Sequence, residues 1–168
     1  MVREVLTIGD ERLLQISQPV AKEEFGTKEL NDLITDMYDT MQYKNGVGIA
    51  AIQIGYLKRV ILIGYDGNNP RYKSIGDCPL TVIINPQIEV IGDKVCERDE
   101  GCLSVPGMRG TVSRAEHIRY KFYNQSGELI EGESDGFFAR AMQHETDHLN
   151  GVLFPSRITD PSTFHKIS

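Results

Sequence analysis

Two histidines in the segment His144-Glu145-Thr146-Asp147-His148 constrain this chain more than any other feature. Side chains four residues apart lie on one face of an α-helix, so His144 and His148 can direct their imidazoles at one metal ion. Glu145 can then reach a water at that ion, which is the HExxH arrangement of metal-dependent hydrolases. The alternative is a chance pair on a solvated face. The chain has 4 histidines, and finding two of them in this turn with a glutamate between favours the metal site.

A catalytic site of this kind needs a third protein ligand, because zinc and similar ions usually bind three side chains and keep one position open. After His148 the only acidic side chain is Asp160, so we expect the third ligand upstream. Cys102 offers a thiolate there, and the turn-forming pair Pro106-Gly107 suits a thiol presented at the end of a strand. Taken alone, Cys102 would be a buried and inert core thiol. The helix motif makes a metal ligand the better interpretation.

The hydrophobic pattern predicts two helices. Residues 28–42 place apolar side chains at three-and-four spacing, which is typical of an amphipathic helix with Thr27 as its N-cap and a stop at Asn45-Gly46. Residues 137–150 form the helix that carries the histidines, for which Asp135 is the predicted cap. The methionines of the first helix are interpreted as core residues.

Strands are predicted between these helices. Residues 59–63 indicate a buried strand, residues 80–90 a strand with an edge or bulge at Asn85-Pro86, and residues 95–103 an extended segment. Residues 117–123 and 129–133 form a predicted hairpin. Residues 64–79 are expected to form a long loop, and the tail beyond Pro155 to be poorly ordered. Helices and strands are segregated, which predicts an α+β fold with antiparallel or mixed β-sheets packed around the C-terminal metal-binding helix.

Length, charge and cysteine usage narrow the class of protein. A chain of 168 residues has the size of one domain, and we expect residues 1–168 to form it. The net charge of -6 argues against direct nucleic-acid binding. The N-terminal segment has no apolar signal-peptide core, and no apolar run is long enough to cross a membrane. With 3 cysteines, an odd number, a disulfide framework is not expected and the predicted location is the cytoplasm.

Three motifs together resemble the peptide deformylase family. Residues 46–53, Gly-Val-Gly-Ile-Ala-Ala-Ile-Gln, are similar to its GxGxAAxQ, residues 100–104 match its EGCLS, and residues 144–151 match its HExxHxxG. The motifs occur in the family's order, and the resemblance covers nearly the whole chain. It implies a cytoplasmic hydrolase that removes the N-formyl group from the formylmethionine of nascent polypeptides and releases formate.

The resemblance also implies roles for individual residues. Cys102, His144 and His148 would hold one divalent metal ion, with Glu145 moving the proton from the attacking water to the leaving amine. The side-chain amide of Gln53 and the backbone N–H of Leu103 would stabilise the tetrahedral oxyanion. The alternative for Gln53 is an ordinary polar residue at the end of an apolar strand.

Substrate would bind as an added strand between the backbone of Val47-Gly48 and that of Gly101 to Leu103, with the methionine side chain in an apolar pocket. Val47, Phe137 and Ala141 are candidates for that pocket. Phe137 and Ala141 share the helix face of the histidines, although Phe137 suits a plain core position equally well.

Supporting residues are expected around the ligands. Glu100 and Arg114 would form a partly buried ion pair that holds the cysteine segment, against the alternative of a solvated pair of little value. Asp147 could accept a hydrogen bond from the imidazole of His144, or be an ordinary exposed aspartate. Arg140 lies next to the expected pocket, where some family members carry an apolar residue, which leaves specificity beyond methionine open.

Three questions stay open at this level. One thiolate and two imidazoles suit zinc, iron(II), nickel or cobalt, and the resemblance implies iron(II) in the cell. A metallopeptidase that cuts internal bonds shares the HExxH chemistry, and a non-catalytic metal-stabilised binding domain could share the fold. The short tail, residues 158–168, gives no support for docking on the ribosome.

Overall fold

The computed structural model describes residues 1–65 and 78–167, so most of the predicted loop at 64–79 lies outside the described residues. Two sheets are present, one ordered β1-β2-β3-β6-β7 and the other β4-β5-β8. All pairs between these strands are antiparallel, which confirms the predicted α+β class and the antiparallel form of its sheets. The elements are α1 (Lys28–Tyr43), α2 (Phe137–Leu149), β1 (Gly48–Ala50), β2 (Val60–Ile63), β3 (Thr81–Val90), β4 (Val95–Cys102), β5 (Val105–Ala115), β6 (His117–Tyr123), β7 (Leu129–Asp135) and β8 (His165–Lys166).

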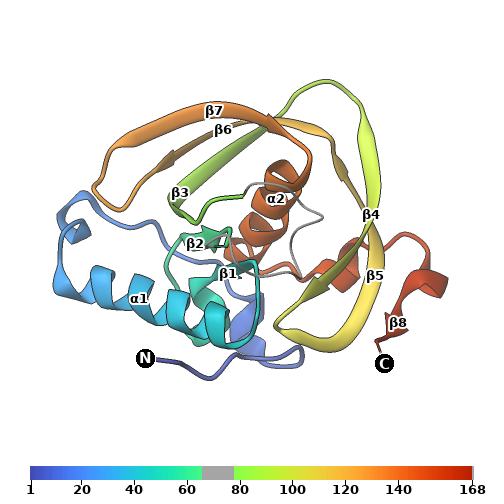
Figure 1. The fold of residues 1–168 in the computed structure, drawn as a ribbon, viewed down its shortest axis with the longest axis horizontal. Helices are drawn as coiled ribbons and strands as arrows, with labels where there is room; N and C mark the ends of the chain where they lie inside the picture. The colour runs from blue at the N-terminus through green and yellow to red at the C-terminus, as the bar shows by residue number, and fades with distance from the viewer. Residues whose placement is uncertain (66–77, 168) are drawn as a thin grey trace.

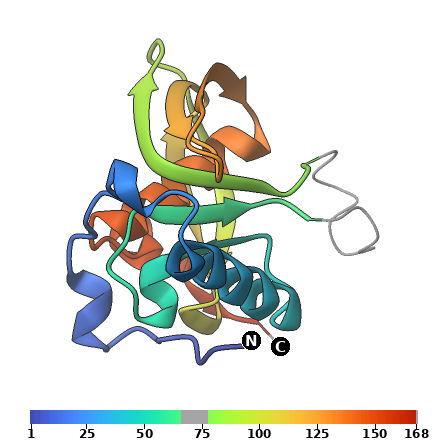
Figure 2. The same cartoon turned by 90° about the vertical axis from the view of Figure 1, so that its left-hand side faces the viewer.

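The sequence of β2 is continuously apolar, without alternation of polar residues, because both faces of the strand are buried. Val60 and Leu62 pack into a cluster with the buried side chains of α1, while Ile61 and Ile63 pack into a second cluster with those of α2. The strand is therefore covered on both faces, which requires a continuous apolar run. In Figures 1 and 2, α1 lies beneath β1 and β2, whereas α2 lies on the other side of that sheet.

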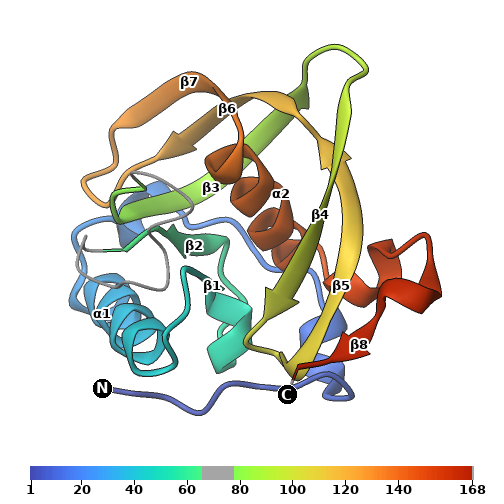
Figure 3. The ribbon, with the colours of Figure 1, turned by 45° about the vertical axis from the view of Figure 1, so that its right-hand side comes forward.

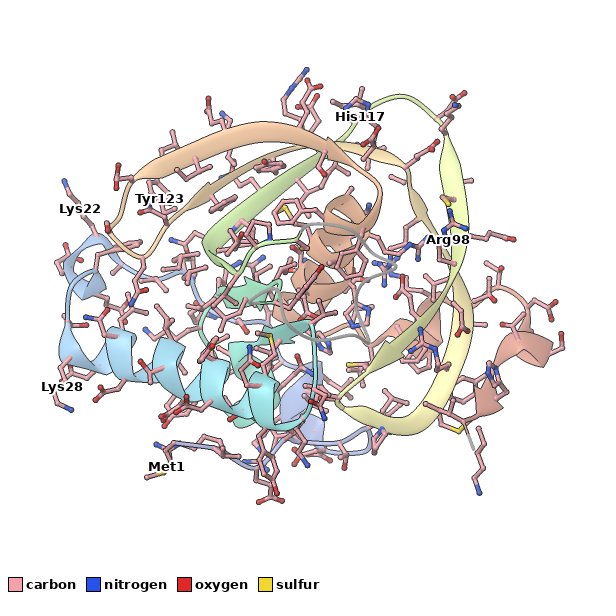
Figure 4. All side chains as sticks on the ribbon, viewed as in Figure 1. Met1, Lys22, Lys28, Arg98, His117 and Tyr123 are labelled. Atoms are coloured by element: carbon pink, nitrogen blue, oxygen red, sulfur yellow. The ribbon has the colours of Figure 1, made fainter. Side chains whose placement is uncertain are left out.

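Helix α2 occupies the space between the two sheets, as Figure 3 shows most clearly. One side of the helix contributes Ala139 and Met142 to the apolar cluster of the larger sheet. Another side faces β4 and β5, where the contacts are ion pairs and hydrogen bonds. The histidines lie at this junction. Charged side chains elsewhere, such as Lys22 and Lys28, project outward from the ribbon in Figure 4.

Of the two predicted helix N-caps, the one for α1 is confirmed and the one for α2 is not. Thr27 caps α1 as expected, since its hydroxyl accepts a hydrogen bond from the N–H of Leu30 at 3.3 Å. The prediction that Asp135 caps α2 was wrong, because Asp135 still belongs to β7 and pairs with His117. The N-cap is Gly136, with a φ of 76°, and no side chain caps the helix there. A glycine is needed where a strand turns directly into a helix through this region of backbone space.

The tail was also predicted incorrectly. Short 3-10 helices at Phe154–Arg157 (η5) and Pro161–Thr163 (η6) follow α2, and β8 then pairs with β5. Phe154 is 2% exposed and packs with Val105 and Val112. The segment is ordered here because β8 pairs with β5, Phe154 is buried and Ile158 is partly buried against the same cluster. Strand β5, which the sequence pattern did not predict, is what they pack on.

No helix in residues 1–65 or 78–167 has the length and apolar content that a membrane crossing requires.

The predicted irregularity at Asn85-Pro86 is confirmed as a shift of register between Ile84 and Gln87. Asn85 has a φ of 53°, and its side-chain amide both accepts from the N–H of Val20 and donates to the C=O of Val20, each at 2.9 Å. The Asn85 side chain therefore satisfies the backbone groups of Val20 as a neighbouring strand would, and it holds the N-terminal segment against the bulge.

We predict that Asn85→Ala lowers the free energy of unfolding by about 3 kcal/mol, because two buried backbone groups lose their partners and alanine is strained at positive φ. Urea denaturation measures the change. Gln87→Ala, at an exposed position of the same strand, should change stability by less than about 0.5 kcal/mol. Equal losses for the two variants would contradict this assignment.

Candidate metal centre

The structure brings together the three predicted metal ligands. In the described part of the chain, the Sγ of Cys102 and one imidazole nitrogen each of His144 and His148 lie within 4.8 Å of one another. The two imidazole rings are 5.3 Å apart between centroids, as expected for residues one turn apart on α2. Both histidines are buried, His144 at 9% exposure and His148 at 1%.

Cys102 reaches this site from the end of β4. It pairs with Val105 across the turn Leu103-Ser104, so the turn lies there rather than at the predicted Pro106-Gly107, which belongs to β5. The turn is anchored, because the C=O of Ser104 accepts from the N–H of Ile8 at 2.7 Å. The Sγ of Cys102 lies 3.3 Å from the Nε2 of His148. A short, anchored turn thus fixes the thiol beside the helix.

The donor set fits a divalent metal ion. One thiolate and two imidazoles are ligands that zinc, iron(II), nickel and cobalt accept, and three protein ligands leave a position for a reactant. Burial lowers the pKa of His148 well below its ordinary value, which favours the neutral imidazole that binds a metal.

The orientation of His144 is set by Glu100. The Oε1 of Glu100 lies 2.8 Å from the Nδ1 of His144, which leaves the Nε2 directed at the site. Arg114 donates to both carboxylate oxygens of Glu100, from Nε at 2.8 Å and from Nη2 at 3.0 Å. The predicted pair is therefore present, and it is more deeply buried than expected, with both side chains at 6% exposure or less.

The prediction that Asp147 accepts a hydrogen bond from His144 was wrong, since its carboxylate binds Arg114 and Arg157 instead. The guanidinium of Arg140, a residue that the sequence placed next to the expected pocket, donates to Glu100 and to the C=O groups of Cys96 and Val112. In both cases helix position gives the direction of a side chain but not the partner that the neighbouring sheet offers.

Glu145 lies beside the ligands in an apolar, enclosed position. It is 5% exposed, its Oε1 is 3.9 Å from the Nε2 of His144, and its Oε2 has no hydrogen-bond partner among the described residues. Burial raises the pKa of Glu145 to about 7. A carboxyl group in this condition can both take and return a proton near neutral pH.

Gly48 is what allows Glu145 to lie there. A Cβ built on Gly48 would lie 2.7 Å from the Oε1 of Glu145, which is closer than real contacts allow. The backbone of β1 therefore passes directly against the carboxylate. The close approach accounts for the glycine at this position of the motif.

Gln53 is fixed by hydrogen bonds at both ends of its amide. Its Oε1 accepts from the N–H of Ala50 at 2.8 Å, and its Nε2 donates to the Oγ of Ser104 at 3.0 Å. The same Nε2 lies 3.5 Å from the Sγ of Cys102. The amide nitrogen therefore faces the hydroxyl of Ser104 and the thiol of the ligand cluster. Sequence reasoning missed Ser104, although it lies inside a recognised motif, and it named Arg140 without the ion pair to Glu100.

The remaining predicted residues lie around this cluster. Val47 and Gly48 are half-buried in and before the edge strand β1, and Gly101 and Leu103 are half-buried at the end of β4. Ala141 is buried at 8% exposure, and Phe137 is partly buried against the same apolar cluster. Both share the α2 face of the histidines, but their packing is that of core residues as well.

Comparison with known proteins decides the family. The family described as Polypeptide deformylase matches residues 2–163. Over 98% of its length the chain is 47% identical to peptide deformylase 2 of Ralstonia nicotianae, covering 91% of that protein. It is 48% identical to peptide deformylase 2 of Pseudomonas syringae pv. tomato, with the same coverage of both chains. The chain belongs to the polypeptide deformylase family.

Solved structures of this family agree with the fold. The class I type b peptide deformylase of Acinetobacter baumannii with Met-Ala-Ser bound superposes with a TM-score of 0.88 at 42% identity, covering 94% of this chain and 99% of that one. The predicted function is thereby confirmed at the level of the family: this is a metal-dependent hydrolase that removes the N-formyl group from nascent peptides. The metallopeptidase and binding-domain alternatives are not favoured.

We predict that Glu100→Gln lowers the free energy of unfolding by about 3 to 5 kcal/mol, because Arg140 loses its carboxylate partner and Arg114 keeps only Asp147. Denaturant titration measures it. Glu97→Gln, the same change at an exposed position of β4, should be neutral. A Glu100→Gln protein as stable as the wild type would show that the ion pair does not hold β4 on α2.

Proposed function

We propose that the formyl group of N-formylmethionyl peptides is hydrolysed at the site formed by Cys102, His144 and His148, which would hold the metal ion. Glu145 transfers the proton, and Gln53 and the backbone N–H of Leu103 stabilise the oxyanion. The observation that carries this proposal is the meeting of one thiol and two imidazoles beside the buried carboxylate of Glu145, whose Oε2 has no hydrogen-bond partner among the described residues. When bound, the divalent metal ion supplies Lewis acidity, which lowers the pKa of water and polarises a carbonyl.

The proton transfers fall to Glu145. Its carboxylate removes a proton from the attacking water as oxygen adds to the formyl carbon, and the protonated acid then gives that proton to the departing amine. The C–N bond breaks, which yields formate and a peptide with a free methionine amine. A pKa near neutrality is what this double role requires, and burial of Glu145 supplies it.

Oxyanion stabilisation is assigned to Gln53 and to the backbone N–H of Leu103. The anchoring of Gln53 by Ala50 and Ser104 supports this, because a donor held in place before reaction loses no energy in reorienting. An amide also adds no net charge beside a cysteine thiolate.

The peptide is proposed to lie as an added strand along Val47 and Gly48 and along Gly101. Strands β1 and β4 each stand at an edge of their sheet, so each presents backbone groups without a strand partner in the described part of the chain. Phe137 and Ala141 are proposed for the methionine pocket, in keeping with their place on the histidine face of α2.

Iron(II) is the metal we propose for the cell, with zinc, nickel and cobalt as ions that the same ligands accept. We further propose a cytoplasmic location, where nascent formylated chains are available, and one domain over residues 1–168. The shared packing of α2 with both sheets supports the single domain.

The function is tested by metal reconstitution. Protein stripped with a chelator and reloaded anaerobically with iron(II), nickel or cobalt should release formate from formyl-Met-Ala-Ser, and the stripped protein should not. An unformylated internal peptide should remain intact. Cleavage of that peptide without release of formate from formyl-Met-Ala-Ser would contradict the deformylase assignment and favour a peptidase.

Glu145→Gln keeps the shape of the side chain but cannot carry the proton. We expect formate release to fall by about 10²- to 10⁴-fold, with metal content unchanged. Glu131→Gln, an exposed position on β7, is the matched control and should retain full activity. Normal turnover by a metal-loaded Glu145→Gln protein would remove Glu145 from the mechanism.

A further inference from the structure

The turn η5, which follows α2, lies against the metal centre, and its Phe154 belongs to the apolar cluster on which Cys102 of β4 packs. Figure 3 shows this part of the chain beside β5, behind the C-terminal end of α2. Phe154 at the start of η5 stacks on His144, with 6.0 Å between ring centroids and 27° between planes. Arg157 at its end reaches Asp147. The turn thus contacts both a proposed ligand and an acidic neighbour on the helix.

Arg157 holds Asp147 with two hydrogen bonds. Its Nη2 donates to Oδ1 at 3.0 Å, and its Nε donates to Oδ2 at 3.2 Å. Such a paired geometry fixes the plane of the carboxylate as well as its position. The Asp147 side chain is only 14% exposed, whereas Arg157 is 51% exposed.

A continuous set of hydrogen bonds leads from Asp147 to the metal ligand. The Oδ2 of Asp147 accepts from the Nη1 of Arg114 at 2.8 Å, and the other nitrogens of Arg114 hold Glu100. Glu100 in turn holds the Nδ1 of His144 at 2.8 Å. Because a guanidinium is rigid and planar, fixing its Nη1 at Asp147 also fixes the plane that Nε and Nη2 present to Glu100.

The stability of a half-exposed pair does not by itself explain this arrangement. Exposed ion pairs contribute little to folding, because solvent screens them and two long side chains lose freedom. What the Arg157 pair adds is a fixed orientation for a buried network, and partners behind a ligand set its aim and its metal affinity.

We propose that Arg157 is a positioning residue for His144, acting through Asp147, Arg114 and Glu100. Phe154 holds the other side of the same imidazole. The inference rests on the proposed function, in that His144 is taken to bind the metal. It assigns to the turn after α2 a role in metal affinity in addition to its packing on β5.

The test compares Arg157→Met with Arg119→Met in the full chain. Arg119 on β6 is a matched control, because it is also 51% exposed and also pairs with a carboxylate, that of Glu133 on β7, at 3.1 Å. The readouts are the dissociation constant for Co²⁺, titrated anaerobically into stripped protein, and the visible absorption of the bound Co²⁺. Steady-state kinetics on formyl-Met-Ala-Ser follow kcat and KM separately.

Arg157→Met should weaken Co²⁺ binding by about threefold to tenfold, less than removal of a direct partner of a ligand, which costs about 10- to 100-fold. Its Co²⁺ spectrum should shift and kcat should fall at unchanged KM. Arg119→Met should match the wild type in all of these. Arg157→Lys keeps the charge without the planar fork and should recover only part of the affinity.

If Arg157→Met binds Co²⁺ with the wild-type dissociation constant and shows the wild-type Co²⁺ absorption spectrum, the proposal is overturned. If Arg157→Met does not fold, Arg157→Lys is judged by the same two readouts against Arg119→Met. A wild-type protein that fails to bind one Co²⁺ per chain would instead contradict the proposed function, so the two failures are distinguishable.

Discussion

The buried carboxylate of Glu100 is the interaction on which the rest of the site depends. Burying a charge costs several kcal/mol unless partners replace its water, and here Arg114, Arg140 and His144 do so. The partners come from β5 and α2, while Glu100 comes from β4. One side chain therefore joins the smaller sheet to the metal helix. It also aims the imidazole of His144, so folding and ligand geometry depend on the same contact.

Two glutamates in this small volume have opposite properties because of their partners. Burial alone would raise the pKa of Glu100, but hydrogen bonds from His144 and Arg114 outweigh it and lower that pKa. Glu145 is equally buried and lacks such donors, so burial raises its pKa to about 7. The first carboxylate is thus a permanent anion that supports structure, and the second can exchange a proton. Separation of pKa values between neighbouring acids is a general mark of divided roles.

The surroundings of the site come from segments far apart in the sequence. Gly48 lets β1 pass against Glu145, Ser104 anchors Gln53, and Phe154 covers His144 from the tail. The contacts of Gly48 and Phe154 depend on close packing, and that of Ser104 is a hydrogen bond between uncharged groups. The elements that enclose the site are in turn stabilised by the two apolar clusters on either side of β2 and by a third cluster, in which Phe154 packs with Val105 and Val112.

The sequence alone determined the family, the α+β class and the candidate ligand set of Cys102, His144 and His148, because helical periodicity and short motifs are local and place chemical groups directly. Only the tertiary structure decided the partners: Glu100 rather than Asp147 for His144, Arg140 in the ion network, and an ordered tail on β5. The physical reason is that a side chain's direction follows from its own helix or strand. Which group it meets depends on the register of another strand and on how the helix packs between the sheets.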